Sequence, residues 1–361
     1  MATKDTPQTC DAYNYEPATR VSGRMAPAET ISAGLTMGTV KATLGFCALL
    51  LFVGCLIAPG FAAEEQKIIF GLTNRTGTVA LPHVVAEEKG FFKSEGLNAT
   101  LIVMQNQVVV NALVAKNIDY GGTFSNMVGG ALSGLPIRIV MVLMEAGEHV
   151  LVTHPEIKRV EDLKRKIVGI SSFGGAPHTQ VTMILRKYGL NPEKDVTFLQ
   201  IGGTPSRYAA LESGSVDAVM LQPPFNKIAQ KREFRELIAF NDIAKVPLGA
   251  IAVHRDRIKE RPDEIVRIMR AELKSIDYIR TRKDDVLAIM EKSWGIKDRD
   301  IREQVYRDAL PIYSQNGMVS DEAMQQVIQI IQGTRKTTRE VPLSEIVDWR
   351  FAKQAVAELK K

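Results

Sequence analysis

The sequence predicts an α/β protein in which mostly parallel sheets are flanked by helices. Short β-rich runs alternate with helical patterns through the first two thirds of the 361 residues, as is typical of parallel strands joined by helical crossovers. A helix–turn–strand motif also occurs twice, and the last third is charged amphipathic helix with almost no strand signal. At this length, with 45% apolar residues, the chain is expected to form two lobes with their own cores.

An apolar segment from Ala42 to Ala63 precedes the first predicted strand. It follows a lysine and ends in small residues, an order typical of secretory signals, so we expect residues 1–62 to be a signal peptide cut after Ala62. A transmembrane anchor and a lipoprotein signal that acylates Cys55 are the alternatives. The residues before Met37 are polar and show no periodic pattern, which indicates that translation starts later than Met1, at Met25 or Met37. The mature protein is therefore expected outside the cytoplasm, in the periplasm.

The predicted mature chain lacks the residues that several classes of enzyme need. All three cysteines, Cys10, Cys47 and Cys55, precede the cleavage site, so no thiolate nucleophile or cysteine-based metal centre is expected. The motifs G-x-S-x-G, H-E-x-x-H and G-x-x-x-x-G-K-[ST] do not occur. The net charge of +5 is small and scattered, which argues against nucleic-acid binding. We expect no catalytic residue, no metal and no cofactor.

The first α/β unit combines three predicted strands with two helices. Its helices end where glycine or a polar turn follows the apolar pattern. Its predicted elements are strand 67–72, helix 79–89, strand 97–103, helix 106–116 and strand 118–122.

The second unit repeats this order. Its predicted elements are strand 166–170, a helix from Pro177 to Gly189, strand 196–201, and helix 205–213, which Thr204 caps. Ala112-Leu113-x-x-x-x-Ile118-Asp119-Tyr120 in the first unit matches Ala210-Leu211-x-x-x-x-Val216-Asp217-Ala218 in the second. Because open α/β sheets bind ligands at the carboxyl ends of their strands, two such units are expected to face each other across a cleft.

Amphipathic helices make up the rest of the chain. They are predicted over 262–292, 298–310 and 320–333, with a last helical segment at 342–361. We expect them to pack on a lobe that the preceding segments build.

Four loops that follow predicted strands carry Ser, Thr, Gly or Asn at the start of a helix. They are Thr73–Gly77, Thr123–Asn126, Ser171–His178 and Gly202–Thr204. Helix N-termini present unpaired N–H groups and partial positive charge, which bind carboxylates, sulfonates and other oxygen-rich groups. One such loop is usually only a helix cap, whereas four in two facing units indicate a ligand site.

Two cations and a histidine are candidates for ligand contacts in these loops. Arg75 is the candidate for pairing with an anionic ligand, against the alternative of an exposed loop arginine. Arg207 is a weaker candidate, because its position suits the surface. His178 suits either a ligand donor or a structural role.

For three aromatic side chains and one carboxylate, the sequence is compatible with a place in the cleft and with a place elsewhere. Phe124, Phe173 and Phe225 supply either cleft walls or core packing, and Glu145 faces either the cleft or solvent.

Segments 86–97, 160–169, 171–178 and 211–218, in this order behind a signal peptide, resemble the nitrate/sulfonate/taurine-type periplasmic binding proteins of ABC importers. The resemblance covers residues 66–361. It implies the type II periplasmic-binding-protein fold, with lobe one at 63–149 and 250–361, lobe two at 150–249, and C-terminal helices packed on lobe one. The crossings between lobes would lie near 148–152 and 248–253.

The resemblance also implies a set of ligand-binding loops, which coincide with the loops above and add Gln222 and Pro223. Arg165 stands where the family usually has glycine, which should affect a turn and not function. Gln222 stands where many relatives have an aromatic residue, which leaves the ligand class open. The predicted ligand-binding residues are Asn74, Arg75, Thr76, Gly77, Thr123, Phe124, Ser125, Asn126, Ser171, Ser172, Phe173, Gly174, Gly175, Ala176, His178, Gly203, Thr204, Gln222 and Pro223.

By this resemblance the protein binds a small polar or anionic molecule by hinge closure and delivers it to ABC permease transmembrane subunits. A monomer that binds no nucleic acid is expected. A neutral heterocycle or an aromatic acid is an alternative ligand. The alternative function is an enzyme on the same fold, similar to the thiamine pyrimidine-precursor synthases, which use an iron site with a cysteine-rich motif.

Overall fold

The computed structural model describes residues 65–335 and 340–361. The predicted signal peptide, its cleavage site and all three cysteines lie outside the described residues. In the described part of the chain, no helix is both long and apolar enough to cross a membrane.

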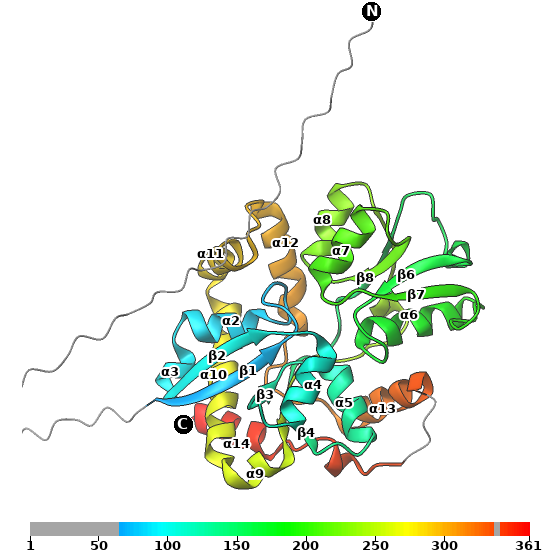
Figure 1. Ribbon diagram of the computed structural model, residues 1–361. Helices are drawn as coiled ribbons and strands as arrows, with labels where there is room; N and C mark the ends of the chain where they lie inside the picture. The colour runs from blue at the N-terminus through cyan, green and yellow to red at the C-terminus, as the bar shows by residue number, and fades with distance from the viewer. Residues whose placement is uncertain (1–64, 336–339) are drawn as a thin grey trace, which may run out of the picture. The chain divides into compact units, whose positions relative to one another are not determined.

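Two five-stranded sheets form the centre of the described chain (Figure 1). The first sheet has the order β2-β1-β3-β10-β4. Its strands are β1 (Gln66–Leu72), β2 (Leu97–Val103), β3 (Tyr120–Gly121), β4 (Ile137–Met144) and β10 (Leu248–His254). β1 pairs parallel with β2 and β3, whereas β10 runs antiparallel between β3 and β4. The predicted strands at 67–72 and 97–103 are confirmed.

The second sheet has the corresponding order β7-β6-β8-β5-β9. Its strands are β5 (Val150–Thr153), β6 (Lys166–Ile170), β7 (Val196–Gln200), β8 (Ala218–Leu221) and β9 (Arg235–Ala239). β6 pairs parallel with β7 and β8, and β5 runs antiparallel between β8 and β9. One strand in each sheet therefore opposes four that share a direction, and the prediction of mostly parallel sheets is confirmed.

The chain crosses between the sheets twice, from β4 to β5 and from β9 to β10. We call the part that carries the first sheet the first half, and the part from β5 to β9 the second half. β10 lies in the first sheet from Leu248 onward. The lobe limits expected from the sequence stay a proposal, in which these two connections form the hinge.

Helices cover the faces of both sheets. In the first half they are α2 (Leu81–Glu88), α3 (Phe91–Ser94), α4 (Asn106–Val114) and α5 (Phe124–Leu132). In the second half they are α6 (Ala176–Lys187), α7 (Thr204–Glu212) and α8 (Phe225–Lys231), with 3₁₀ turns η1 (Val160–Leu163) and η2 (Phe240–Asp242). The sequence predicted that Thr204 caps helix α7. This was wrong, because Gly203 is the N-cap and Thr204 is the first helical residue.

The C-terminal third is helical, as the sequence predicted. It contains α9 (Arg255–Glu260), α10 (Pro262–Thr281), α11 (Lys283–Trp294), α12 (Arg299–Ala309), η3 (Leu310–Ile312), α13 (Asp321–Arg335), η4 (Leu343–Glu345) and α14 (Arg350–Leu359). The single helix predicted over 262–292 is wrong, since Arg282 leaves helical geometry and separates α10 from α11. An interruption by one non-helical residue leaves the apolar periodicity on either side intact, so the pattern alone does not reveal it.

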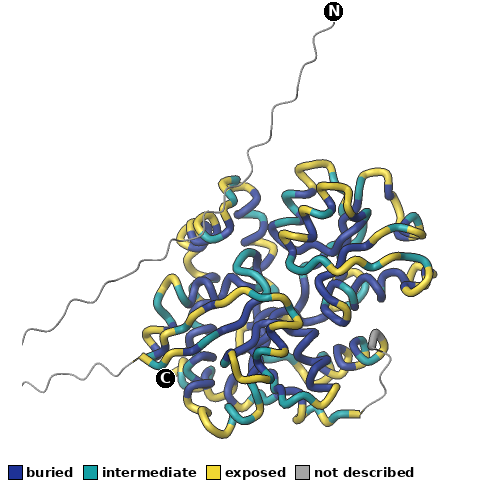
Figure 2. The backbone as a smooth tube through the Cα atoms, in the orientation of Figure 1, coloured by how far each residue is buried: buried dark blue, intermediate teal, exposed yellow. Residues whose placement is uncertain are grey.

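The inner strands of both sheets are buried, whereas the edge strands β2, β7 and β9 are partly exposed, and other exposed residues gather on loops and outer helix faces (Figure 2). The apolar stripe of α10, which includes Ile265, Ile268 and Met269, belongs to the core of the first half. A second apolar cluster contains residues of both halves, among them Val109 of α4 and Val181 of α6. The two halves therefore share a core at the hinge side instead of being joined by linkers alone.

Candidate functional site

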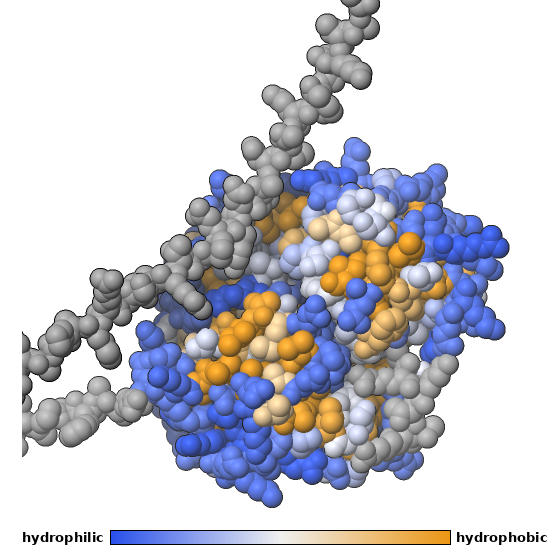
Figure 3. All heavy atoms as spheres, viewed as in Figure 1, coloured by the Kyte–Doolittle hydropathy of each residue, from blue (hydrophilic) through white to orange (hydrophobic). Residues whose placement is uncertain are grey.

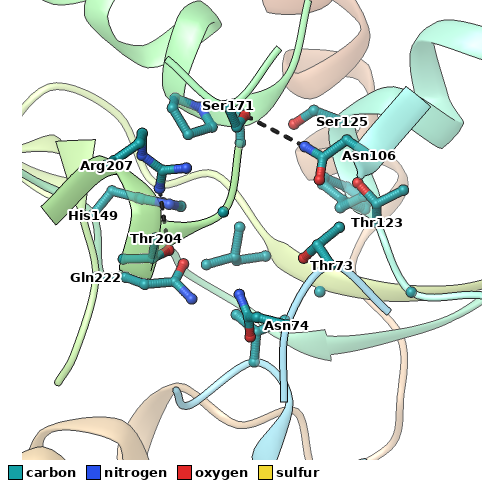
Figure 4. A pocket seen from close by; sticks show the side chains of 18 residues that line it. Thr73, Asn74, Asn106, Thr123, Ser125, His149, Ser171, Thr204, Arg207 and Gln222 are labelled. Atoms are coloured by element: carbon teal, nitrogen blue, oxygen red, sulfur yellow. Dashed lines mark hydrogen bonds between the residues drawn. The ribbon is translucent and has the colours of Figure 1, made fainter. Parts of the chain in front are cut away.

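Loops and helix starts from both halves enclose a cavity of about 70 Å³ (Figure 4). Its walls come from the ends of β1, β3, β6 and β8, from the first crossing, from the start of β10, and from the first turns of α4 to α7. The cavity is lined by Thr73, Asn74, Val79, Asn106, Gly122, Thr123, Phe124, Ser125, His149, Ser171, Ala176, Pro177, Gly203, Thr204, Arg207, Gln222, Leu248 and Gly249.

Arg207 is the only lining residue of this cavity that carries a formal charge at neutral pH. The residue is 2% exposed. Its guanidinium donates to the carbonyl oxygens of Gly202 and Met220 and to the hydroxyl of Thr204, which is 3.1 Å away. Burial lowers the pKa of Arg207 to about 9, so it remains protonated at neutral pH. No described carboxylate balances this charge.

His149 is the second titratable group on the wall. Burial, and then the neighbouring charge of Arg207, lower its pKa to about 3, so the imidazole is neutral at physiological pH. Phe240 donates its backbone N–H to the carbonyl oxygen of His149, which ties the first crossing to the second. The cavity thus combines one buried cation with neutral donors and acceptors.

Side chains from the two halves meet directly at one end of the cavity. The amide nitrogen of Asn106 lies 3.4 Å from the hydroxyl of Ser171, and that of Asn126 lies 3.5 Å from the hydroxyl of Ser172 (Figure 4 shows the first contact). At another point the carbonyl oxygen of Pro223 and the side chain of Gln222 approach Gly77, which has a φ of +99°. A Cβ at Gly77 would lie 3.0 Å from the Pro223 oxygen, so this approach requires glycine.

A wider groove adjoins the cavity and shares Thr73, Asn74, Asn106 and Gly203 with it. Arg75 and Thr76 line this groove. Exposed apolar side chains lie on both edge strands beside it, including Val103 at the end of β2 and Leu199 of β7. Apolar surface is visible on both halves of this face in Figure 3.

The structure brings together about half of the predicted ligand-binding residues. Those that line the cavity are Asn74, Thr123, Phe124, Ser125, Ser171, Ala176, Gly203, Thr204 and Gln222. Those that do not are Arg75, Thr76, Gly77, Asn126, Ser172, Phe173, Gly174, Gly175, His178 and Pro223.

The strongest individual candidates from the sequence have other contacts. Arg75 donates to Glu87 within the first half. His178 accepts a hydrogen bond from the backbone N–H of Gly174 and packs against Phe173, which is 59% exposed. These side chains hold the loops in shape without reaching the cavity.

Phe225 and Glu145 also lie away from the cavity. Phe225 packs against Tyr208. Glu145 is exposed and lines a separate surface groove.

Several cavity residues were missing from the set of predicted ligand-binding residues: Arg207 was only a weaker candidate in the sequence, and His149 was not considered. A local signal existed for Arg207, because it lies one helical turn after Thr204 and therefore on the same face of α7. No local signal existed for His149, since it reaches the wall only through the path of the first crossing. Thr73 and Pro177 lie in loops that the sequence predicted to bind ligand, and the remaining lining residues outside the prediction are Val79, Asn106, Gly122, Leu248 and Gly249.

A family profile described as "NMT1/THI5 like" matches residues 78–285. Among curated relatives, the nitrate import ATP-binding protein NrtC of Synechocystis is 24% identical over 57% of this chain, which spans only 34% of NrtC. YtlA of Bacillus subtilis is 21% identical over 77% of this chain and 86% of its own length. The 4-amino-5-hydroxymethyl-2-methylpyrimidine phosphate synthase THI12 of Saccharomyces cerevisiae is 23% identical over 64% of this chain and 70% of its own length.

Solved structures show the same fold. The alkanesulfonate-binding protein SsuA of Xanthomonas axonopodis pv. citri, bound to MOPS, has a TM-score of 0.68 at 16% identity, covering 79% of this chain and all of SsuA. The periplasmic nitrate-binding protein NrtA of Synechocystis has a TM-score of 0.67 at 13% identity, covering 82% of this chain and 90% of NrtA. The predicted periplasmic-binding-protein fold is therefore confirmed, while identities this low carry no information about the ligand.

Proposed function

The chain belongs to the NMT1/THI5-like family, and from this premise we propose that it is the solute-binding protein of an ABC importer. It captures a small anionic molecule between its two halves and delivers it to the transmembrane subunits of a permease. It works as a monomer outside the cytoplasm and catalyses no reaction. The cavity residues supply the ligand contacts.

The buried positive charge of Arg207 is the observation that supports an anionic ligand. A charge removed from water without a partner is costly, and a bound anion would offset that cost. The neutral groups around it, such as Thr204, Gln222 and Ser171, suit the remaining oxygen atoms of a carboxylate, sulfonate or oxyanion.

The size of the cavity supports a compact ligand. A cavity of about 70 Å³ holds more than one water-sized group and is small compared with the pockets of several hundred cubic ångströms that larger ligands fill. This suits the anionic head of a molecule, and a longer ligand would extend into the adjoining groove past Arg75 and Val103.

The distribution of contacts between the halves supports closure on the ligand. Arg207 and Gln222 come from the second half, whereas Asn74 and Thr123 come from the first. A ligand that contacts both sets binds the closed form better than any open form, and this difference drives hinge closure.

A thermal-shift screen of the purified protein tests the proposal. The panel contains nitrate, small sulfonates, small carboxylates, aromatic acids and neutral pyrimidines. A compact anion at a hundred times its Kd should stabilise the protein by about 2.7 kcal/mol through mass action. Stabilisation by neutral pyrimidines alone would contradict an anion-binding site.

Replacing Arg207 tests the residue that the proposal depends on. We expect Arg207→Met to remove the thermal shift caused by the anion, because the balancing charge is lost, while circular dichroism of the unliganded variant stays unchanged. Arg232→Met is the matched control, since Arg232 is an exposed arginine of the second half that pairs with Glu212. If Arg207→Met unfolds, Arg207→Lys keeps a charge and should bind the anion more weakly. An unchanged shift in a folded Arg207→Met protein would reject the assignment.

The synthase relatives in yeast support one alternative, an enzyme on the same fold. The iron-dependent synthases use a cysteine-rich motif, and no cysteine follows Cys55 in this sequence. Incubating the purified protein with iron and a nucleotide-like substrate separates the two functions. Product formation would establish the enzyme, whereas binding without turnover supports the importer component.

A further inference from the structure

Two ion pairs join the halves between α8 and α12, and one of them lies near Glu148 of the first crossing. Lys227 Nζ lies 3.8 Å from Asp308 Oδ2, and Lys231 Nζ donates to Asp298 Oδ2. Both lysines belong to α8 of the second half, and the two aspartates stand at opposite ends of α12 in the first half (Figure 1). The other ion pairs recorded between residues in 65–335 and 340–361 stay within one half.

An apolar contact from α8 accompanies these ion pairs. Ile228 packs against the core cluster of its own half, which includes Tyr208, and also against the cluster of the first half, which includes Val305 of α12. Lys231 follows Lys227 by four residues and Ile228 by three, so its side chain neighbours both of them on the surface of α8. The side of α8 that meets the first half therefore combines two cations with one apolar side chain.

The aspartate at position 298 has two separate roles. Its Oδ1 accepts from the backbone N–H of Ile301 and caps α12, whereas its Oδ2 accepts from Lys231. The pKa of Asp298 is lowered, first by the hydrogen bond from Lys231 and then by the bond from Ile301. The cap belongs to one half and the ion pair spans both, so the two roles are separable by substitution.

We propose that α8 and α12 form an electrostatic latch, which favours the closed arrangement of the halves and makes the open-to-closed ratio depend on salt. The proposal rests on the function proposed above, since a latch of this kind sets how much of the protein is closed before the ligand arrives. It acts outside the cavity and contacts no ligand.

The exposure of the four charged groups sets the expected size of the effect. Lys231 and Asp298 are 53% and 38% exposed, whereas Lys227 is 16% exposed and Asp308 47%. Exposed ion pairs contribute little and are screened by salt, so we expect each pair to change the open-to-closed ratio by about twofold. Such a modest latch biases closure while leaving the halves free to open.

Energy transfer between two dyes measures this ratio in the full-length protein. The dyes are attached to cysteines placed at exposed Ser213 and Lys297, after Cys10, Cys47 and Cys55 are replaced by serine. The unliganded protein should become more open as sodium chloride rises from about 0.01 to 1 M, where the screening length falls from about 30 to 3 Å.

Substitutions separate the latch from general effects on the helices. Lys231→Met and Asp298→Asn should each raise the open fraction, and the double variant should open no further than either one alone. Asparagine is also a good N-cap, so Asp298→Asn removes the charge and leaves the cap. Arg232→Met is the control, because the neighbouring Arg232 pairs with Glu212 in the same half. The open fraction of this control should match the original protein.

The latch is overturned if Lys231→Met and Asp298→Asn open the protein no more than Arg232→Met, or if salt leaves the ratio unchanged. The proposed function fails separately. Salt-dependent opening in a protein that no anion stabilises would support the latch and reject anion capture. Anion binding with a salt-independent ratio would support capture and reject the latch.

Discussion

Arg165 has a backbone φ of 66° in the turn that leads into β6. The resemblance to known binding proteins implies glycine at this position, and the structure supplies the reason. Left-handed geometry places the Cβ of an L-residue close to its own backbone, whereas glycine has no Cβ. The backbone N–H of Arg165 donates to the backbone carbonyl oxygen of Asp195, and this hydrogen bond holds the turn in its left-handed geometry. Arginine in place of glycine at position 165 therefore affects the stability of this turn, and the residue does not line the cavity.

Arg165→Gly is expected to stabilise the protein by about 1 kcal/mol, because it removes this steric cost. Arg165→Ala keeps a Cβ and should give no comparable gain. Urea unfolding of both variants measures the difference. Equal stability of the glycine and alanine variants would show that the backbone conformation is not the cause.

Elements repeat between the halves down to single hydrogen bonds. Asp119 Oδ2 accepts from the backbone N–H of Ile69 at 2.7 Å, and Asp217 Oδ2 accepts from that of Ile167 at 2.8 Å. Each aspartate follows a helix and joins the start of a short strand to the neighbouring parallel strand. The sequence motif that contains both aspartates therefore encodes a structural tether, which explains the repeat without any role in binding.

Asp217→Ala should destabilise the protein by about 1 kcal/mol, since the N–H of Ile167 loses its acceptor. Asp217→Asn retains an acceptor for that N–H but loses the ion pair with Lys166, so a smaller loss is expected. Chemical unfolding of the two variants ranks them. The tether has no energetic importance if Asp217→Ala unfolds at the same urea concentration as the original protein.

At the scale of the whole molecule, the first crossing buries polar groups where the halves meet. Glu148 lies in the first crossing and accepts from the hydroxyl of Thr78. Burial raises its pKa to about 7, and the nearby Asp308 raises it as well, whereas Thr78 and Lys227 lower it. Tyr313 also lies close, and Glu148 contributes to its raised pKa. The first crossing thus holds a carboxyl group that is protonated in the folded protein at mildly acid pH.

Glu148 should make the protein less stable as pH rises. Between its ordinary pKa of 4.5 and about 7, the folded state binds a proton that the unfolded state has lost. The free energy of unfolding therefore falls across this range, by about 3 kcal/mol in total. Glu148→Gln keeps an acceptor for Thr78 and should remove this loss, so it should be more stable than the original protein at pH 8 and similar at pH 4.5.

Urea unfolding at the two pH values checks this, with Glu145→Gln as the control at an exposed neighbouring carboxylate. His149 acts in the opposite direction, since its lowered pKa makes stability fall as pH drops below 6.5, in both proteins alike. A stability difference between Glu148→Gln and the original protein that is the same at both pH values would contradict the prediction.

The sequence by itself determined part of the order of strands and helices, the duplicated unit and the loops from which many cavity residues come, whereas strands β4, β5, β9 and β10 were not predicted. Apolar periodicity, glycine stops and the paired aspartates are local patterns, readable from neighbouring residues. The resemblance added the fold, and the comparisons confirm it.

Only the tertiary structure decided which side chains reach the cavity. Arg75 pairs within its own half, while Arg207 and His149 are brought to the wall by α7 and by the first crossing. The contact of Lys231 with Asp298 likewise joins positions far apart in the chain. Local patterns carry no information about such distances, because they arise only when the two sheets are placed against each other.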